Sequence, residues 1–399
     1  MINDVYEVSS EIRKILALSG ETLSDAYVIE KIEEHILTDE RFAYRSFKEN
    51  RILIDSVFNS LRKDLGILQP YIENEQVSEI MVNGSSSVFV EFKDGITQVS
   101  EKFYSSDEVE ELIRRIAGRV RKEFNELNPI LDARLEDGSR VNAVYKNVAL
   151  GGPSLTIRKF PKEALTMDKL IELGTVTSEA ADFLRNLVFA GYNIFISGGT
   201  SSGKTSLLNC LTEFIPEDER IVVIEDSAEL QIKGHSNVIR LECKAANSQG
   251  IGEITMTDLI KTSLRMRPER IIVGEVRGKE VADMINANNT GHDGSISTGH
   301  GNSVKGMIKR LEAMFLQATD FPMAAIRAQI TEGIDIFVHL QRMPDRSRKV
   351  VEITEICGFS GDEYILNPLF SYSPEKGLVP TGNTIADDFK FRIRGKYEN

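Results

Sequence analysis

The clearest chemical signal in the chain is a glycine-rich turn between an apolar run and a helical pattern. Residues 194–197 predict a strand, residues 198–203 a turn, and residues 204–211 a helix that opens on Lys-Thr. In such a loop the backbone N–H groups converge on an anion, and the helix N-terminus adds its positive dipole end. The sequence therefore predicts a phosphate-binding loop made of Gly198, Gly199, Thr200, Ser201, Ser202, Gly203, Lys204, Thr205 and Ser206.

Two side chains of this loop have the chemistry that a nucleoside triphosphate needs. Lys204 can reach the β- and γ-phosphates, and the Thr205 hydroxyl can ligate Mg²⁺. Glycine is favoured in the turn because a Cβ would keep the backbone away from the phosphates. A Gly/Ser loop that matches by chance is the plain alternative. The strand before the turn and the helix after it favour a site for ATP and Mg²⁺ instead.

An acidic residue at the end of a second apolar strand supplies a group that hydrolysis requires. Glu275 follows the apolar run 270–274, and the carboxyl ends of strands lie near the phosphates in a doubly wound sheet. Glu275 is therefore a candidate to ligate Mg²⁺ through water or to polarise the attacking water. Gly274 stands where a Walker-B aspartate is usual, so Glu275 would act alone or through water. A capping acid at a strand end is the alternative.

Two further groups of polar residues follow apolar strands. Glu225, Asp226 and Glu229 come at the end of the run 221–224, where they are candidates to hold Mg²⁺-bound waters or to orient the nucleophile; a solvated turn is the alternative. His292 and His300 flank a short apolar strand and have glycine neighbours. No third soft ligand lies nearby in the sequence, so a γ-phosphate sensor or proton shuttle fits better than a metal site.

Composition places the chain among ordinary globular proteins. It has 399 residues, 41% hydrophobic and 27% charged, with a net charge of −13 and three scattered cysteines. The acidic balance argues against broad nucleic-acid binding, and the cysteines argue against a disulfide framework; buried small hydrophobes are their default role. No apolar run approaches the roughly 18 residues of a membrane span, and the N-terminus lacks a signal-peptide pattern. We therefore expect a cytoplasmic protein.

Hydrophobic periodicity divides the chain into three folded parts and a linker. Residues 1–64 predict a helical module, and residues 65–160 predict an α+β domain. Residues 161–175 form the expected linker, because Pro161 disfavours helix in the residue before it. Residues 176–399 alternate helix and strand as in a doubly wound α/β sheet, with candidate strands at 193–197, 220–225, 237–241, 270–274, 294–298 and 335–340.

The order of these motifs resembles the type II/type IV secretion ATPases. In that superfamily the loop at 198–205, the acids at 225–230, Gly-Glu-Val-Arg at 274–277 and Gly-His-Asp-Gly-Ser at 291–295 correspond to the Walker A, Asp box, Walker B and His box. A glycine before the Walker-B acid is the family's habit. Residues 65–71, 78–84, 132–143 and 154–160 look like the CpaF-type branch, the motor ATPases of Tad/Flp pilus assembly.

The resemblance covers about residues 50 to 360. The family's tetracysteine zinc motif, found in the general type II secretion branch, is absent. One departure is Gly301, because many relatives have alanine after the histidine.

The resemblance implies a hexameric ring built from a PAS-like N-terminal α+β domain and a RecA-like C-terminal P-loop NTPase domain. Each nucleotide would lie between these two domains of one chain. Three arginines of the N-terminal domain match motif positions that approach the phosphates, and one arginine beside the Walker-B acid is a candidate in the C-terminal domain. They are, in order, Arg134, Arg140, Arg158 and Arg277.

The resulting hypothesis is an Mg²⁺-dependent ATPase that powers pilus assembly or protein secretion as a homohexamer. It would associate peripherally with the cytoplasmic face of the inner membrane through a platform protein, without direct nucleic-acid contact. A conjugative DNA-transfer ATPase or nucleic-acid translocase is the first alternative, although no sustained Lys/Arg stripe with interleaved aromatics is present. A non-motor scaffold that binds nucleotide is the second.

Overall fold

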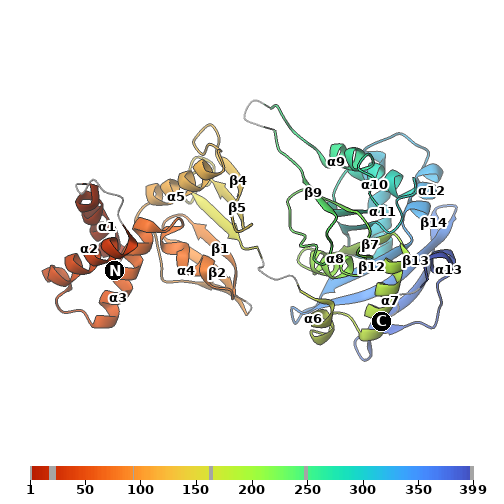
Figure 1. The fold of residues 1–399 in the computed structure, drawn as a ribbon, viewed down its shortest axis with the longest axis horizontal. Helices are drawn as coiled ribbons and strands as arrows, with labels where there is room; N and C mark the ends of the chain where they lie inside the picture. Colours follow the sequence, from red (N-terminus) through yellow and green to blue (C-terminus); the bar gives the residue numbers. More distant parts are fainter. Residues whose placement is uncertain (1, 18–23, 93, 161–164, 247–249, 396–399) are drawn as a thin grey trace. The chain divides into compact units, whose positions relative to one another are not determined.

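The computed structural model describes residues 2–17, 24–92, 94–160, 165–246 and 250–395. The chain folds into two compact units, Met1–Lys162 and Glu163–Asn399 (Figure 1). The boundary falls inside the linker that the sequence predicts at 161–175, of which residues 161–164 lie outside the described part. The rest of that stretch holds a helix, α6 (Met167–Glu172), whose Met167 and Leu170 are buried in the core of the second unit.

The first unit begins with three helices that pack on one another. These are α1 (Ile2–Ala17), α2 (Asp25–Thr38) and α3 (Phe47–Arg62), with a 3₁₀ turn, η1 (Glu40–Phe42), before α3. Apolar residues at helical spacing form their shared core: Val8, Ile12, Val28, Ile32, Ile36, Phe42, Leu53, Ile54 and Val57. Ser46 caps α3 with Glu49 in a capping box, which fixes where the helix begins.

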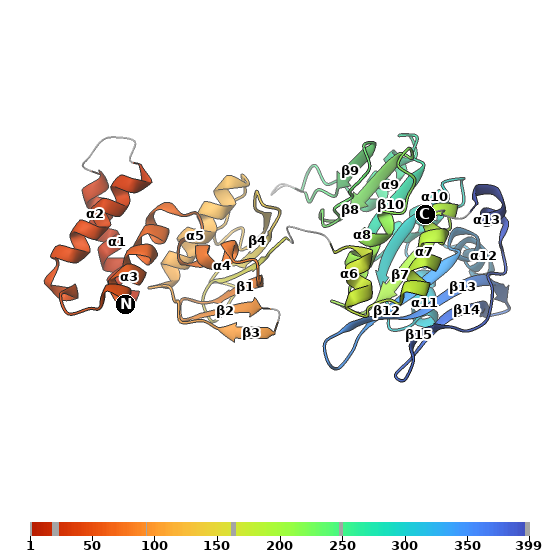
Figure 2. The ribbon, with the colours of Figure 1, turned by 60° about the horizontal axis from the view of Figure 1, so that its bottom comes forward.

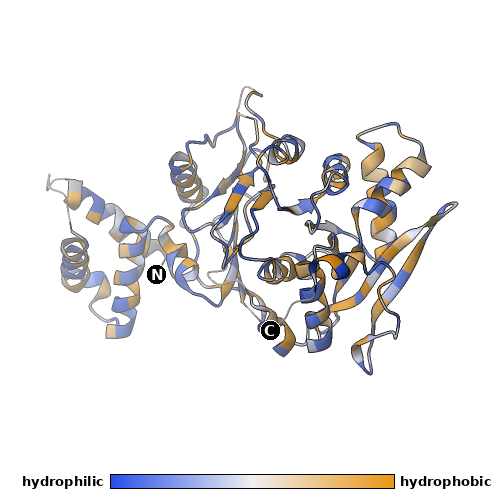
Figure 3. Cartoon of the chain, turned by 45° about the vertical axis from the view of Figure 1, so that its right-hand side comes forward, coloured by the Kyte–Doolittle hydropathy of each residue, from blue (hydrophilic) through white to orange (hydrophobic). Residues whose placement is uncertain are grey.

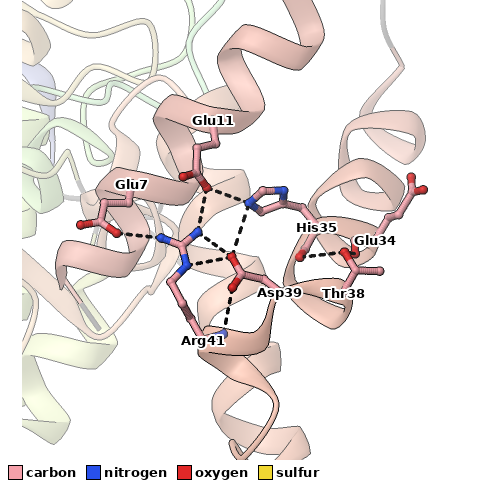
Figure 4. Close-up of polar contacts among 7 residues, drawn as sticks. All are labelled: Glu7, Glu11, Glu34, His35, Thr38, Asp39 and Arg41. Carbon is pink, nitrogen blue, oxygen red and sulfur yellow. Dashed lines mark hydrogen bonds and ion pairs between the residues drawn. The ribbon is translucent and has the colours of Figure 1, made fainter.

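A polar network on the surface of this helical module joins α1 to α2 and η1 (Figure 4). Arg41 donates to Glu7 and Glu11 at 2.8 and 2.9 Å and to Asp39, and His35 Nε2 lies 2.8 Å from Glu11 Oε2. Glu11, His35 and Asp39 are close enough to share a cation. The Arg41 guanidinium already supplies that positive charge, so the network reads as a helix-to-helix contact.

The second part of the first unit is a six-stranded antiparallel sheet in the order β3-β2-β1-β6-β5-β4. The helix α5 and the short segments η2 and α4 complete this α+β domain, as the sequence predicts. The bounds are η2 (Gly66–Leu68), α4 (Gln69–Glu73), β1 (Val77–Asn83), β2 (Ser87–Phe92), β3 (Gly95–Gln98), α5 (Ser106–Arg119), β4 (Ile130–Arg134), β5 (Arg140–Val144) and β6 (Ser154–Arg158).

The second unit is built on a nine-stranded sheet in the order β15-β14-β13-β12-β7-β11-β10-β8-β9 (Figure 2). Its parallel part, from β12 to β9, confirms the doubly wound α/β fold. The parallel strands are β7 (Ile194–Gly198), β8 (Ile221–Glu225), β9 (Val238–Glu242), β10 (Arg270–Val276), β11 (Ile296–His300) and β12 (Ile336–Arg342). The antiparallel extension is β13 (Arg348–Ser360), β14 (Glu363–Ser373) and β15 (Gly377–Pro380).

Helices cover both faces of this sheet, and its strands β7 and β8 are buried along their whole length (Figure 3). Within β7, Ile194 and Ile196 face one core, shared with α6, α7 (Ser178–Ala190) and α8 (Lys204–Thr212). Phe195 faces the other core, shared with α9 (Met256–Ser263), α10 (Glu280–Asn288), α11 (Val304–Leu316) and α12 (Met323–Gly333). A short helix, α13 (Phe389–Arg394), lies at the end of the described part of this unit.

Two observations bear on the expectations from composition. Within the described ranges, the helices are all too short or too polar to cross a membrane. All three cysteines are free, but only Cys210 is buried, whereas Cys243 is half-buried and Cys357 is exposed. The default role of buried small hydrophobes therefore holds for Cys210 alone, because the other two lie toward the sheet edge and in the long hairpin.

Candidate nucleotide-binding site

The predicted phosphate loop joins the C-terminal end of β7 to the N-terminus of α8, in the middle of the parallel sheet. Gly203 caps α8 with φ of 98°, and Ser201 also adopts a left-handed conformation, with φ of 57°. Gly198 is required by packing, because a Cβ there would lie 2.5 Å from Leu340 O on β12. The loop thus wraps tightly around the helix N-terminus, which is the geometry of an anion-binding nest.

Lys204 lies inside this loop with 8% of its surface exposed. Its Nζ donates to the carbonyls of Gly198 and Gly199 at 3.2 and 3.0 Å, and it lies 3.2 Å from His300 Nδ1. Burial lowers the pKa of Lys204, and Glu275 partly opposes that shift. The ammonium group is therefore held at the floor of the loop, where an incoming phosphate would replace its neutral carbonyl acceptors by an anionic one.

Glu275, His300 and Arg277 form one chain of contacts that ends at Lys204. His300 Nε2 lies 2.7 Å from Glu275 Oε1, and Arg277 donates to Glu275 Oε2 from Nε and Nη2 at 3.0 and 2.7 Å. Glu275 lies within β10, and His300 ends β11, the strand next to β7. Parallel strands therefore bring an acid, an imidazole and two cations to the same edge of the sheet as the loop.

The environment of His300 favours its neutral form. Burial lowers its pKa below the ordinary 6.5, the charge of Lys204 acts in the same direction, and Glu275 partly opposes them. In the neutral ring, Nδ1 can accept from Lys204 and the proton is then on Nε2, which lies 2.7 Å from Glu275 Oε1 without an aligned hydrogen bond.

Packing explains why a glycine stands at position 274, before Glu275. A Cβ there would lie 3.1 Å from Glu225 Cγ.

The three acids after β8 do not act as a group. The Glu225 side chain is buried, and its Oε1 accepts the backbone N–H groups of Glu229 and Leu230 at 2.7 and 2.8 Å. Burial raises the pKa of Glu225. Asp226 instead lies 3.6 Å from Arg277, at the rim of the Glu275 cluster. Glu225 thus shapes the following loop, whereas Asp226 contacts Arg277.

The two predicted histidines occupy opposite ends of β11. His300 lies at the C-terminal end, beside the phosphate loop, whereas His292 precedes the strand, with Nδ1 3.2 Å from Ala287 O at the end of α10. The seven residues between them include most of the five-residue strand β11, which at about 3.3 Å per residue spans roughly 13 Å. The structure therefore brings His300, and not His292, to Lys204 and Glu275 within one chain.

The glycine-rich turn that carries His292 packs around a buried arginine. Arg270 is fully buried at the start of β10, where it pairs with Glu219 and donates to Val188 O and Gly294 O at 3.0 and 3.3 Å. The Asn193 side chain accepts the N–H groups of Gly294 and Ser295 at 2.9 and 3.0 Å. Sequence patterns did not predict this cluster, although a charged residue opening a strongly apolar strand was a visible signal.

Substituting Gly294 by alanine is expected to destabilise the second unit by about 3 kcal/mol or more. Its φ is 80°, and a Cβ there would lie 1.6 Å from Arg270 Nη1, so backbone strain and overpacking add. Gly291→Ala is the matched control, because φ is 91° but no heavy atom lies within 4 Å of its Cβ position; about 1 kcal/mol is expected. Urea unfolding measures both, and equal losses would contradict the Arg270 contact.

His339 is a buried residue of the site that lies outside the sequence motifs. It lies on β12 opposite Ser197 of β7, with Nδ1 2.8 Å from Ser197 Oγ, and its ring also hydrogen-bonds the backbone of Asn302. It therefore ties the residue before the phosphate loop to the segment after His300. Burial lowers its pKa. A histidine in an otherwise apolar strand was the only sequence signal.

Protonation of His339 is expected to oppose folding at acidic pH. The unfolded chain binds this proton near the ordinary pKa of 6.5, above the lowered pKa of the folded state. The contribution of neutral His339 to the free energy of unfolding is therefore fully present above pH 6.5, and it is lost as the pH falls through the lowered pKa of the folded state. We expect stability to fall less between about pH 7.5 and about pH 5.5 in His339→Gln than in the wild type, as measured by urea unfolding. Parallel pH profiles would contradict this.

The three arginines predicted in the first unit form a row across one sheet. Arg134 on β4 pairs with Arg140 on β5, and Arg140 pairs with Arg158 on β6. Like charges directly opposite each other are unfavourable in a sheet, and Glu79 of β1 stands opposite Arg158 at the end of this row, where its carboxylate offers a counter-charge. Arg134 Nε donates to Gly138 O at 3.3 Å, and its guanidinium lies over the Phe160 ring.

The loop residues fit a nucleotide and Mg²⁺. Ser202 Oγ is buried and has no hydrogen-bond partner within the described ranges, inside a loop whose amides would surround a phosphate. The Thr205 hydroxyl is half-buried in the first turn of α8, and Glu275 supplies a carboxylate. Both are oxygen donors, the type that Mg²⁺ prefers. Thr205 and Glu275 are thus the residues that would hold the metal directly or through water.

The chain is similar to several known proteins. It is 44% identical over 241 residues to an uncharacterized protein of Methanocaldococcus jannaschii, and the match covers 58% of this chain and 33% of that protein. The conjugal transfer protein TrbB of Rhizobium radiobacter is 30% identical, with 73% of this chain and 88% of the relative covered. The crystal structure of the pilus retraction motor PilT with bound ADP shares the fold, with a TM-score of 0.55, 20% identity and coverage of 83% and 85%.

The family comparison covers most of both units. The model described as "Type II/IV secretion system protein" matches residues 62–356, which include the arginine row, the phosphate loop and the Glu275 cluster. The match begins near the end of α3, so it leaves most of the helical module outside. The chain belongs to the type II/IV secretion system protein family.

Proposed function

We propose that this chain is an ATPase that hydrolyses ATP in the presence of Mg²⁺ and acts as a motor of a secretion or pilus machine. The observation that supports it most is the chain of contacts from Lys204 through His300 to Glu275 and Arg277, next to a phosphate loop. A loop alone binds phosphate, whereas an acid and an imidazole beside it supply what water attack needs.

Each side chain has a distinct role in this proposal. The loop amides and Lys204 bind the β- and γ-phosphates, and Mg²⁺, when bound, neutralises charge on the phosphate oxygens. Glu275 orients the attacking water and takes its proton as the water oxygen bonds to the γ-phosphorus and ADP leaves. Neutral His300 donates toward Glu275 and reports the presence of the γ-phosphate. Arg277 stabilises developing negative charge, with Asp226 holding it near Glu275. Glu225 and Glu229 act indirectly, through the loop after β8.

The arginine row of the first unit supplies further positive charge to the nucleotide in this proposal. Arg134, Arg140 and Arg158 lie in direct register on neighbouring strands, so their positive charges are gathered along one line of the sheet. Their planar guanidinium groups suit bidentate contacts to phosphate. His292, which lies away from the phosphate loop of its own unit, has no assigned step.

The machine is the finer part of the proposal. A homohexamer would drive Tad-type pilus assembly or protein secretion and would meet the cytoplasmic face of the inner membrane through a platform protein. The family description names secretion, and PilT, which shares the fold, is named a pilus retraction motor. Conjugal DNA transfer is the second candidate, because TrbB carries that name. The net charge of −13 weighs against direct DNA binding by this chain.

The test compares ATP hydrolysis by the purified full chain alone, with DNA, and with membranes that contain the platform protein. The proposal predicts phosphate release that rises with membranes and not with DNA, and a particle mass of six 44.7 kDa chains with nucleotide. Salt-sensitive stimulation by DNA would favour the conjugal candidate. Absence of phosphate release in all three samples would favour a nucleotide-binding scaffold.

A further inference from the structure

A cavity of about 230 Å³ opens beside the phosphate loop, entirely within the second unit. Its walls come from α6 and the residues near it, from the first turn of α8, and from the turn between β12 and β13. Pockets that enclose a whole small-molecule ligand are typically roughly 300–1,000 Å³, so this cavity suits one part of a ligand.

The position of the cavity defines which part of a nucleotide would enter it. Gly203 and Ser206 line one wall, and both belong to the end of the phosphate loop and the first turn of α8. Phosphates bind along this N-terminus, over the loop amides. The portion of the nucleotide beyond the phosphates therefore continues past Ser206 into the cavity.

The α6 side of the cavity is apolar and accessible. Leu165 and Leu173 line it with 37% and 54% of their surfaces exposed, and Leu170 lies beneath them in the core. Exposed leucines next to a polar phosphate loop leave apolar surface in water that a flat, apolar ring would cover. The surface matches a nucleobase better than a further charged group.

The opposite wall is a cationic turn with a strained backbone. Arg346 lines the cavity and has φ of 68°, a left-handed conformation that costs an L-residue about 1–2 kcal/mol relative to an ordinary one. Glycine normally fills this position in a hairpin turn. The turn itself is well formed, because Met343 O accepts from Arg346 N and Ser347 O accepts from Met343 N, at 2.9 and 2.8 Å.

The turn also contacts the phosphate loop directly. Arg348 Nε donates to Ser201 O at 3.0 Å, and its aliphatic stem lies over Gly203. Across the hairpin, Arg348 pairs in register with Arg342, an unfavourable like-charge pair. The turn beside the site therefore carries both backbone strain at Arg346 and like-charge repulsion between Arg342 and Arg348. Such strain is typical of segments that bind a ligand.

We propose that Arg346 binds the purine base of the nucleotide, stacking its guanidinium on the ring opposite the leucines of α6. Guanidinium groups stack well on flat aromatic rings, and the leucines would cover the other face. Arg348 positions the phosphate loop through Ser201. The inference rests on the proposed nucleotide site and deepens it, because it assigns the base-binding residues that the sequence motifs leave open.

Calorimetric titration of the purified chain with Mg²⁺-ADP and with inorganic triphosphate, which lacks a base, tests this proposal. Arg346→Gly is expected to weaken ADP binding about tenfold, to leave triphosphate binding within about twofold, and not to lower the melting temperature, because glycine relieves the strain. Arg346→Ala should lose the same affinity but melt below Arg346→Gly. Arg392→Ala, an exposed arginine of α13 that does not line the cavity, is the control and should bind ADP like the wild type.

The possible results separate this inference from the proposed function. Unchanged ADP binding in Arg346→Gly would overturn the base-binding role. Equal weakening of ADP and triphosphate would overturn it as well, because Arg346 would then recognise phosphate charge. If the wild-type chain bound neither compound, the nucleotide site itself would be wrong, and the proposed function would fall with it.

Discussion

Replacing Lys204 by alanine is expected to lower ATP turnover at least about 10²-fold. The ammonium group is buried at the floor of the phosphate loop, 3.0 Å from Gly199 O and 3.2 Å from His300 Nδ1. Its charge stabilises the phosphoryl group as bonding to the leaving oxygen breaks. Steady-state phosphate release with saturating Mg²⁺-ATP measures the loss.

The fold should survive this change, because a buried cation with a lowered pKa is costly and its removal leaves mainly carbonyl acceptors near solvent. Lys376→Ala, in the turn between β14 and β15, is the control and should keep wild-type turnover. Turnover within threefold of the wild type in Lys204→Ala would show that catalysis does not run through this loop.

Glu275→Gln is expected to keep ATP bound while lowering hydrolysis by about 10²–10⁴-fold. Glutamine has nearly the same shape, so contacts with Arg277 and His300 can persist, but the amide cannot take a proton from water. Two measurements on Glu275→Gln check this. The ATP affinity by calorimetry should stay within a few-fold of the wild type, whereas phosphate release should fall to the level of Lys204→Ala.

The control for both measurements is Glu217→Gln, because Glu217 is an exposed acid in the turn before β8. It removes the same charge from the unit without touching the Glu275 cluster and should leave both affinity and turnover unchanged. Near-normal phosphate release in Glu275→Gln would contradict its assigned role. The Glu275 cluster would then be an ion-pair network that anchors β10 to β11.

The sequence predicted the parts of the site that depend on local chain order. The phosphate loop was predictable because glycines, Lys204 and the flanking strand and helix are contiguous, and their geometry is set within a few residues. Glu275 and His300 were predictable as strand-end residues, since parallel strands end at one edge. The arginine row was expected from the family resemblance alone, and its register across β4, β5 and β6 is new from the structure.

Features that depend on distant packing were not predictable. His292 and His300 look equivalent in the sequence, but they lie at opposite ends of β11, because a five-residue strand separates the turn from the site. Gly294 belongs to a sequence motif that suggests catalysis. The structure instead explains the glycine by packing, because the Arg270 guanidinium, from the start of β10, occupies the space that a Cβ would need. His339 and the cavity at Arg346 arise only when β12 and β13 pair beside the loop.

The helices and strands were likewise predictable where the local sequence pattern alone determines them. Strands β7 and β8 match their expected ranges closely, because uninterrupted apolar runs identify buried parallel strands. α6 was assigned to a linker, since its six residues are too few to show helical periodicity. α12 and α13 also escaped prediction, α12 because its apolar residues are diluted by alanine, glutamine and threonine.

Phosphate release from Mg²⁺-ATP by the purified wild-type chain, with Lys204→Ala run beside it as the blank, tests the central claim most directly. We expect saturable release by the wild type, with a rate in the Lys204→Ala blank that is at least about 10²-fold lower. Wild-type release no faster than the blank, in a sample that calorimetry shows to bind ATP, would contradict it. The loop would then bind nucleotide without hydrolysing it.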